Sequence, residues 1–198
     1  EPVIFVVDDD SHIRDGIRTV LEEGGLVVKT YSTGEAFLQA YRPGRDACLL
    51  VDAYLPGMNG LELLRRLNEM GQRPPSIMIT GFGDVPMAVQ AMKAGALDFI
   101  EKPIGRADLL ASVTRALERS TDAAKLSAWR QAAANRIAKL TARERSVMEM
   151  VLAGQPSKNI ATDLGISQRT VESHRASIMH KTGSKSLPAL ARLALAAA

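Results

Sequence analysis

The chain has 198 residues, of which 46% are hydrophobic and 24% are charged, and its formal net charge is +3. This balance excludes a disordered chain, and the apolar runs are far shorter than the roughly 20 residues of a membrane span, so we expect a cytoplasmic protein without membrane association. The single cysteine, Cys48, excludes an internal disulfide and fits a reducing compartment.

The first 120 residues alternate between short apolar runs, which predict strands, and stretches with apolar residues on one helical face. The predicted strands are residues 3–7, 26–31, 48–52, 75–80 and 97–100. The predicted helices begin at Ser11, after a capping box at residues 32–35, near Gly60, at Val85 and before Leu109. This alternation predicts an α/β fold with a doubly wound, five-stranded parallel sheet.

Five polar side chains follow the predicted strands, and we expect all of them at the carboxyl edge of the sheet. They are Asp8, Asp9, Asp52, Thr80 and Lys102. A lone aspartate at a strand end most often caps a loop, but three carboxylates at one edge repel one another unless a cation neutralises them. Oxygen ligands favour Mg²⁺, which commonly also contacts a phosphate oxygen. The set therefore predicts transfer of a phosphoryl group onto Asp52, with Lys102 and Thr80 donating to the phosphate.

Four short motifs resemble those of bacterial two-component receiver domains, in the same order and spacing, over residues 3 to about 118. They are Val6-Val7-Asp8-Asp9, Asp52 followed by Pro56-Gly57-Met58-Asn59-Gly60, Ile79-Thr80-Gly81, and Lys102-Pro103. The resemblance implies that Asp52 accepts a phosphoryl group from a sensor histidine kinase. It implies a Mg²⁺ site, in which Mn²⁺ could substitute, formed by Asp9, Asp52 and the Tyr54 carbonyl, with Asp8 binding through water. Lys102 would pair with the phosphate, commonly beside a cis Lys102–Pro103 bond.

The resemblance also implies a conformational switch. Thr80 would move to bond the new phosphoryl oxygen, and the Phe99 ring would turn into the vacated space. Residues 83–103 are similar to the FixJ type of response regulator, which implies a phosphorylation-dependent dimer contact at Val89 and Lys93. Taken from the residues alone, Val89 fits core packing equally well and Lys93 fits a solvated charge.

The stretch from Arg119 to Lys139 contains no Pro or Gly and is rich in Ala. Apolar residues recur in it at helical spacing, at Leu126, Trp129, Ala133 and Ile137. We therefore expect a helical linker over residues 121–137, either separate from the preceding helix or continuous with it, in which Trp129 is a packing anchor.

Charge is unevenly distributed along the chain. Residues 1–120 carry 13 Lys and Arg against 17 Asp and Glu, residues 121–137 carry 3 against 1, and residues 138–198 carry 9 against 4. The acidic first part and the basic last part indicate two domains with different partners, and the basic part is a candidate for binding nucleic acid.

Residues 138–198 predict four short helices. A capping box at residues 141–144 opens the first, Ser157 caps the second through Leu164, a turn at residues 165–167 precedes the third over 168–181, and the fourth covers 187–195. Two helices joined by a short turn with Gly are typical of a helix-turn-helix. Leu140-Thr141, Arg143-Glu144, Lys158-Asn159-Ile160-Ala161, Ile166-Ser167, Thr170-Val171, His174 and Lys181 resemble the LuxR/FixJ DNA-binding domain. Thr182 departs from the apolar residue expected after Lys181, which leaves the end of the third helix open.

The third helix is the candidate recognition helix. Its candidate base contacts are Arg169, Glu172, Ser173, Ala176 and Ser177, which lie opposite the apolar face. Candidate phosphate contacts are Lys158, Thr170, His174, Arg175, Lys181 and Lys185. A solvated role fits each basic side chain equally well, and an internal hydrogen bond is an alternative for His174. The fourth helix could form a dimer interface.

We thus expect a receiver domain over residues 1–120, a linker over 121–137 and a helix-turn-helix domain over 138–198. The chain resembles response regulator transcription factors of the FixJ/NarL family. It would dimerise when phosphorylated, bind promoter double-stranded DNA and activate transcription with RNA polymerase. It would not be a turnover enzyme. Two alternatives are an aspartate-nucleophile phosphatase, which usually carries a second acid where this chain has Tyr54, and a module that binds protein or RNA.

Overall fold

The computed structural model describes residues 2–42, 47–81, 83–121 and 123–198. The chain divides into two compact units, one of residues 1–83 with 90–123 and the other of residues 84–89 with 124–198. Within the described ranges, none of the helices combines the length and the apolar character that crossing a bilayer requires.

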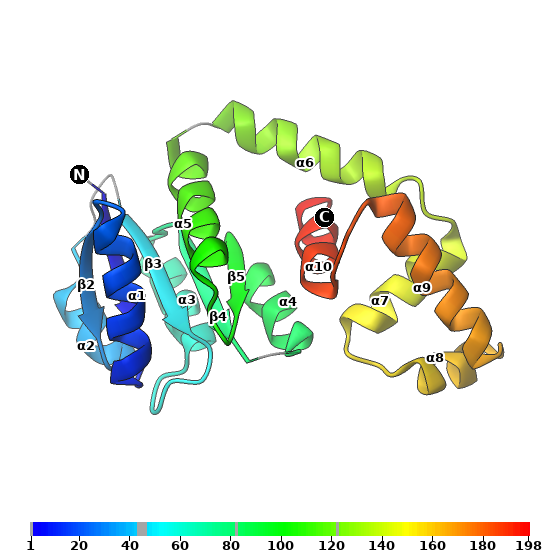
Figure 1. Cartoon of the computed structure of the whole chain (residues 1–198), viewed down its shortest axis with the longest axis horizontal. Helices are drawn as coiled ribbons and strands as arrows, with labels where there is room; N and C mark the ends of the chain where they lie inside the picture. Colours follow the sequence, from blue (N-terminus) through cyan, green and yellow to red (C-terminus); the bar gives the residue numbers. More distant parts are fainter. Residues whose placement is uncertain (1, 43–46, 82, 122) are drawn as a thin grey trace. The chain divides into compact units, whose positions relative to one another are not determined.

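A five-stranded sheet forms the centre of the first unit, with every neighbouring pair of strands parallel and the order β2-β1-β3-β4-β5 (Figure 1). The strands are β1 (Val3–Val7), β2 (Val27–Tyr31), β3 (Ala47–Asp52), β4 (Ser76–Thr80) and β5 (Asp98–Glu101). The connecting helices are α1 (Ser11–Glu23), α2 (Gly34–Ala40), α3 (Gly60–Glu69), α4 (Val85–Lys93) and α5 (Arg106–Thr121). The predicted doubly wound fold is confirmed.

The central strands β3 and β4 are buried on both faces, as their apolar residues predict, whereas the edge strand β2 is partly exposed. Alternate residues of β1 point to opposite faces, so Ile4 and Val6 join a core with α1 and α5, while Phe5 packs edge-on against Phe37 of α2 at 5.5 Å between ring centroids. Figure 1 shows α1 and α5 together on one face of the sheet. Because all the strands are parallel, their carboxyl ends lie at one edge of the sheet, where loops lead into the helices.

One predicted cap in this unit is wrong. The N-cap of α2 is Thr33, whose hydroxyl accepts a hydrogen bond from the Ala36 amide, and not Ser32 of the expected capping box. Glu35 is therefore not at the position from which a capping-box carboxylate bonds the N-cap amide. Its carboxylate accepts a hydrogen bond from the distant Met58 amide at 3.1 Å.

The second unit contains the helical linker and the helix-turn-helix. Its elements include α6 (Ala123–Ile137), α7 (Ala142–Leu152), α8 (Ser157–Leu164), α9 (Gln168–Thr182) and α10 (Leu187–Ala196). Helix α9 packs against α7, α8 and α10. The capping box of Thr141 and Glu144 is present, and Gly165 ends α8 in the left-handed conformation that a tight turn needs.

The structure corrects the cap of α8 and settles the end of α9. Pro156 precedes α8 without a side-chain cap, and Ser157 is the first helical residue, so its hydroxyl is available for another partner. Helix α9 continues through Thr182, which is buried. Its hydroxyl donates to the Ile178 carbonyl at 2.7 Å, so the buried polar group has a partner. A polar residue therefore fits this position without breaking the helix.

Helix α6 covers residues 123–137 of the stretch predicted to be a helical linker. Helix α5 ends at Thr121 and α6 begins at Ala123, and the question of their continuity falls on residue 122, outside the described residues. The side chain of Leu126 also lies outside the described part, whereas Ala133 is buried. The exact domain boundaries stay predictions.

Candidate functional site

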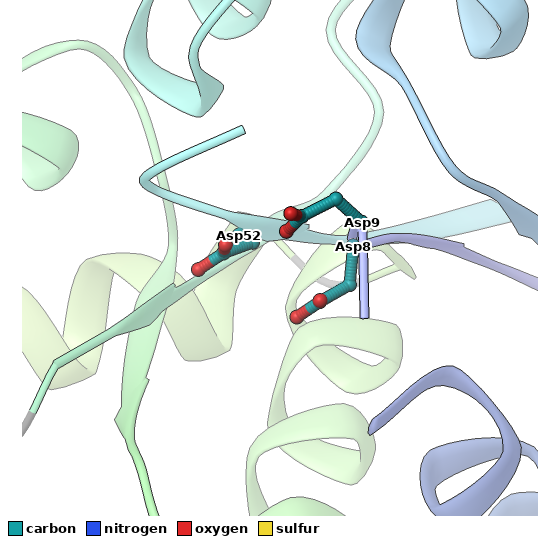
Figure 2. A group of neighbouring side chains, drawn as sticks. All are labelled: Asp8, Asp9 and Asp52. Carbon is teal, nitrogen blue, oxygen red and sulfur yellow. The ribbon is translucent and has the colours of Figure 1, made fainter. Parts of the chain in front are cut away.

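Three aspartates meet at the carboxyl edge of the sheet. Strand β1 ends just before Asp8 and Asp9, β3 ends on Asp52, and the pairing of Val7 with Val51 brings the two strand ends side by side. One carboxylate oxygen of each aspartate lies within 4.8 Å of the others. Figure 2 shows the three carboxyl groups pointing to the same side.

A lysine from a third segment of the chain joins this cluster. The Lys102 ammonium lies 3.2 Å from Asp8 Oδ2 and 3.2 Å from Asp52 Oδ1. Lys102 follows β5, and its amide donates to the Thr80 carbonyl at 2.8 Å, which ties the loop to β4. The Lys102–Pro103 peptide bond is cis. The structure thus brings together the side chains of Asp8, Asp9, Asp52 and Lys102, and Thr80 ends the neighbouring strand β4.

Burial sets the electrostatics of the cluster. Asp8 is fully buried and Asp52 nearly so, whereas Asp9 is exposed. Burial raises the pKa of the Asp52 carboxyl, and the Asp8 carboxylate adds to this effect while the Lys102 ammonium opposes it. Burial lowers the pKa of Lys102, but the two carboxylates outweigh it and raise that pKa overall. One ammonium therefore does not fully balance the carboxylates.

The donor set fits a small divalent cation. Asp8 Oδ1 accepts the Asp10 amide at 2.9 Å, and the buried Asp8 Oδ2 lies 3.2 Å from the Lys102 ammonium, which it shares with Asp52. A buried carboxylate that shares its counter-charge in this way is costly unless another positive group meets it. Three carboxylates with no nitrogen or sulfur ligand are the set that Mg²⁺ prefers over softer metals.

The turn after β3 holds Asp52 in place. The Tyr54 amide donates to the Asp52 carboxylate, and the Tyr54 ring is exposed. Gly57 has a φ of +74°, a conformation that suits glycine, and the next amide, of Met58, donates to Glu35 of α2. Asn59 then caps α3. Sequence reasoning missed Glu35, because no local pattern marks a partner 23 residues away.

The two residues of the predicted switch lie inside the first unit. Thr80 and Phe99 are both fully buried, on the adjacent strands β4 and β5. Within the described part of the chain, the Thr80 hydroxyl donates to the Ile100 carbonyl at 3.5 Å, which is the long limit for a hydrogen bond. Thr80 is therefore weakly held, beside the strand that carries Asp52. Val89 and Lys93 lie four residues apart on α4, and hence on one face of that helix.

On the predicted recognition helix α9, two residues that were predicted to contact DNA are bonded to a buried glutamate. Glu144 of α7 accepts from the Ser177 hydroxyl at 2.6 Å and from the Lys181 ammonium at 2.8 and 2.9 Å, besides the Thr141 amide at 2.8 Å. These hydrogen bonds, those of Lys181 and Ser177 foremost, lower the pKa of Glu144 to about 2. Ser177 and Lys181 thereby fasten α9 to α7.

Two further predicted DNA contacts are bonded to α8. The Ser157 hydroxyl donates to the Glu172 carboxylate and accepts from the Arg175 guanidinium at 3.2 Å. Arg175 Nε also lies 3.9 Å from Glu172 Oε2. These contacts join the two helices of the helix-turn-helix, so Glu172 and Arg175 stabilise the domain without DNA.

The remaining candidates lie at the surface of the second unit, apart from half-buried His174. Those exposed are Lys158, Arg169, Thr170, Ser173, Ala176 and Lys185. The Thr170 hydroxyl pairs with the Ser167 hydroxyl at the N-terminus of α9. Arg169, Ser173 and Ala176 recur at three- and four-residue spacing, so they form one stripe along α9.

Comparison with known proteins agrees with both units. Residues 4–114 match the family model "Response regulator receiver domain", and residues 138–194 match "Bacterial regulatory proteins, luxR family". The chain is 45% identical over 194 residues to the transcriptional regulatory protein FixJ of Azorhizobium caulinodans, covering 98% of this chain and 92% of that protein. FixJ of Rhizobium meliloti is 45% identical over 193 residues, which cover 98% and 95%. Full-length FixJ from B. japonicum, a solved structure, is 40% identical with a TM-score of 0.57 over 100% of this chain and 97% of that chain.

A receiver domain followed by a LuxR-type DNA-binding domain defines a response regulator that works as a transcription factor, and these relatives are transcriptional regulators. The chain belongs to the FixJ-like response regulators of two-component systems.

Proposed function

We propose that Asp52 is the phosphoacceptor of this response regulator, and that a sensor histidine kinase is its donor. An Asp52 oxygen attacks the phosphorus of the phosphohistidine, the phosphorus–nitrogen bond breaks, and the imidazole leaves with the electron pair. The observation that carries this proposal is the meeting of Asp8, Asp9, Asp52 and Lys102 at one edge of the sheet. Catalysis of this kind consists mainly of positioning and charge neutralisation.

Asp9, Asp52 and the Tyr54 carbonyl would hold Mg²⁺ or Mn²⁺, with Asp8 acting through water. When bound, the cation neutralises charge on the phosphoryl oxygens. Lys102 lies at hydrogen-bonding distance from Asp52 and would turn its ammonium to the new phosphate. Thr80 would donate its weakly engaged hydroxyl to the same group, and the buried Phe99 ring would repack in response.

The output of this switch would be a homodimer that contacts promoter DNA. Dimerisation through the α4 face with Val89 and Lys93 would pair two helix-turn-helix domains, as a twofold DNA site requires. The exposed stripe of Arg169, Ser173 and Ala176 would enter the major groove, and Lys158 would contact phosphate. In the cytoplasm, the bound dimer would activate transcription by RNA polymerase.

The proposal can be tested on the full chain with acetyl phosphate and Mg²⁺, using Asp52→Asn as the matched control. Light scattering should show the mass of a dimer after phosphorylation, and a pool of randomised DNA duplexes should be retained more strongly than before treatment. Asp52→Asn should show neither change. An unchanged mass and unchanged retention in the wild-type chain would overturn the proposal, and steady turnover of a phosphate ester would favour a phosphatase instead.

A further inference from the structure

An arginine near the start of α1 stands where helix electrostatics disfavour a cation. Arg14 is the fourth residue of α1, whose first turn contains no acidic residue, so the carboxylates at this helix end are those of the preceding loop, including the N-cap Asp10. The N-terminus of a helix carries partial positive charge, so a guanidinium there is unfavourable unless it gains something else. Its contacts identify that gain.

Arg14 donates to the backbone immediately before the helix. Its Nη1 lies 2.7 Å from the Asp8 carbonyl oxygen and 3.0 Å from the Asp9 carbonyl oxygen. One planar cation thereby holds two consecutive carbonyls. Each carbonyl belongs to the peptide plane that follows its residue, so the two bonds fix the planes on both sides of Asp9 and with them the direction of its side chain. The plane before Asp8 is held by the Asp8 amide, which donates to the Tyr31 carbonyl at 3.2 Å, so Arg14 also completes the placement of Asp8.

One of these two planes has a second contact in the loop, because the Asp10 amide shares the Asp9–Asp10 plane with the Asp9 carbonyl. The Asp10 amide binds Asp8 Oδ1 at 2.9 Å, and Asp10 in turn caps α1 by accepting the His12 amide at 2.8 Å. These bonds hold one Asp8 oxygen and the start of the helix. Asp9, the exposed member of the acidic cluster, has its carbonyl held by Arg14.

We propose that Arg14 is a positioning residue for the cation of the phosphoacceptor site, and this inference rests on the proposed function. Arg14 bonds to the carbonyls and not to the carboxylates, so it orders the acidic loop without occupying the oxygens that would bind metal. Groups that orient metal ligands through hydrogen bonds, without touching the metal, commonly change metal affinity.

The sign of the effect separates positioning from simple charge. A nearby positive charge repels Mg²⁺, so removing Arg14 should tighten Mg²⁺ binding if only electrostatics mattered. If Arg14 positions Asp8 and Asp9, its removal should weaken binding despite the lost repulsion. Arg18 provides the matched control, because it lies one turn later on α1 and contacts Thr30 and Asp15 instead of the acidic loop.

The test is a Mg²⁺ titration of the full-length wild-type, Arg14→Gln and Arg18→Gln chains without phosphodonor, followed by amide chemical shifts. We expect Arg14→Gln to weaken Mg²⁺ binding about tenfold, and Arg18→Gln to leave it unchanged or slightly tighter. Equal or tighter binding by Arg14→Gln would overturn the inference. A wild-type chain that does not respond to Mg²⁺ would instead overturn the metal site, and the inference with it.

A folding defect is separated by thermal unfolding without metal and by a second variant. If Arg14→Gln does not fold, Arg14→Met keeps an unbranched side chain but has no group that can donate to either carbonyl. Weaker Mg²⁺ binding by Arg14→Met would support the inference, and wild-type affinity would overturn it.

Discussion

Gly60 lies directly against the backbone carbonyl of Asp52, so that a Cβ added to Gly60 would stand 2.2 Å from the Asp52 oxygen. The turn after β3 thus folds back onto Asp52, and the Gly60 amide donates to the Ala53 carbonyl at 3.1 Å. Because the obstacle is backbone, no side-chain movement relieves the clash. Only glycine allows this close approach.

Gly60→Ala should therefore destabilise the first unit by about 1–3 kcal/mol, the usual cost of forcing extra atoms into a packed site. Urea unfolding of the full chain measures this change. Gly16→Ala is the matched control, because nothing lies within 4 Å of a Cβ at this helical position. We expect the control to gain up to about 1 kcal/mol from helix propensity. Equal stability of Gly60→Ala and the wild type would contradict the close approach.

Lys102→Gln should slow phosphorylation of the chain by acetyl phosphate about a hundredfold, since it removes a preorganised donor to the transferring group. The rate of phosphoprotein formation measures this effect. Lys29→Gln, at an exposed position of β2, changes the same charge away from the site and should react at the wild-type rate. Equal decreases of the phosphorylation rate in both variants would indicate an effect of net charge and would contradict a specific role of Lys102.

The ion pair between Glu144 and Lys181 should make the free energy of unfolding depend on pH in the acidic range. The pKa of Glu144 falls from its ordinary 4.5 to about 2 in the folded chain, so its contribution is complete above pH 4.5 and is lost as the pH falls toward 2. Urea unfolding across this window should show a loss of stability that Glu144→Gln lacks. Glu149→Gln, exposed on the same helix, should keep the wild-type slope. Equal slopes in all three chains would argue against the pairing.

Arg169 and Lys181 should behave differently in DNA binding, although both are basic residues of α9. Arg169→Ala should weaken binding to the preferred duplex by about 1–3 kcal/mol and relax preference at one base pair, as expected for a lost base contact. Lys181→Ala should lower the stability of the second unit and leave the preference unchanged, because Lys181 is paired with Glu144. Selection from randomised duplexes with each variant tests this, and a changed preference in Lys181→Ala would contradict it.

The sequence predicts the sheet and its polar edge well, because apolar periodicity and parallel connectivity leave few alternatives. Asp8, Asp52 and Lys102 could be placed together on this basis alone. The contacts of Arg14 and Glu35 could not, since each joins a side chain to backbone in another segment and no residue pattern encodes that geometry. On α9, helical spacing identifies the face opposite the core. It does not show that Ser177 lies near enough to α7 to bond Glu144.

The central claim is that these side chains form a cation-dependent phosphoacceptor at Asp52, and mass spectrometry of the full chain after incubation with acetyl phosphate tests it most directly. The account predicts that one phosphoryl group is added with Mg²⁺ present, that peptide mapping places it on Asp52, and that a chelator or Asp52→Asn prevents it. Phosphorylation at another residue, or equal phosphorylation with the chelator, would contradict the account.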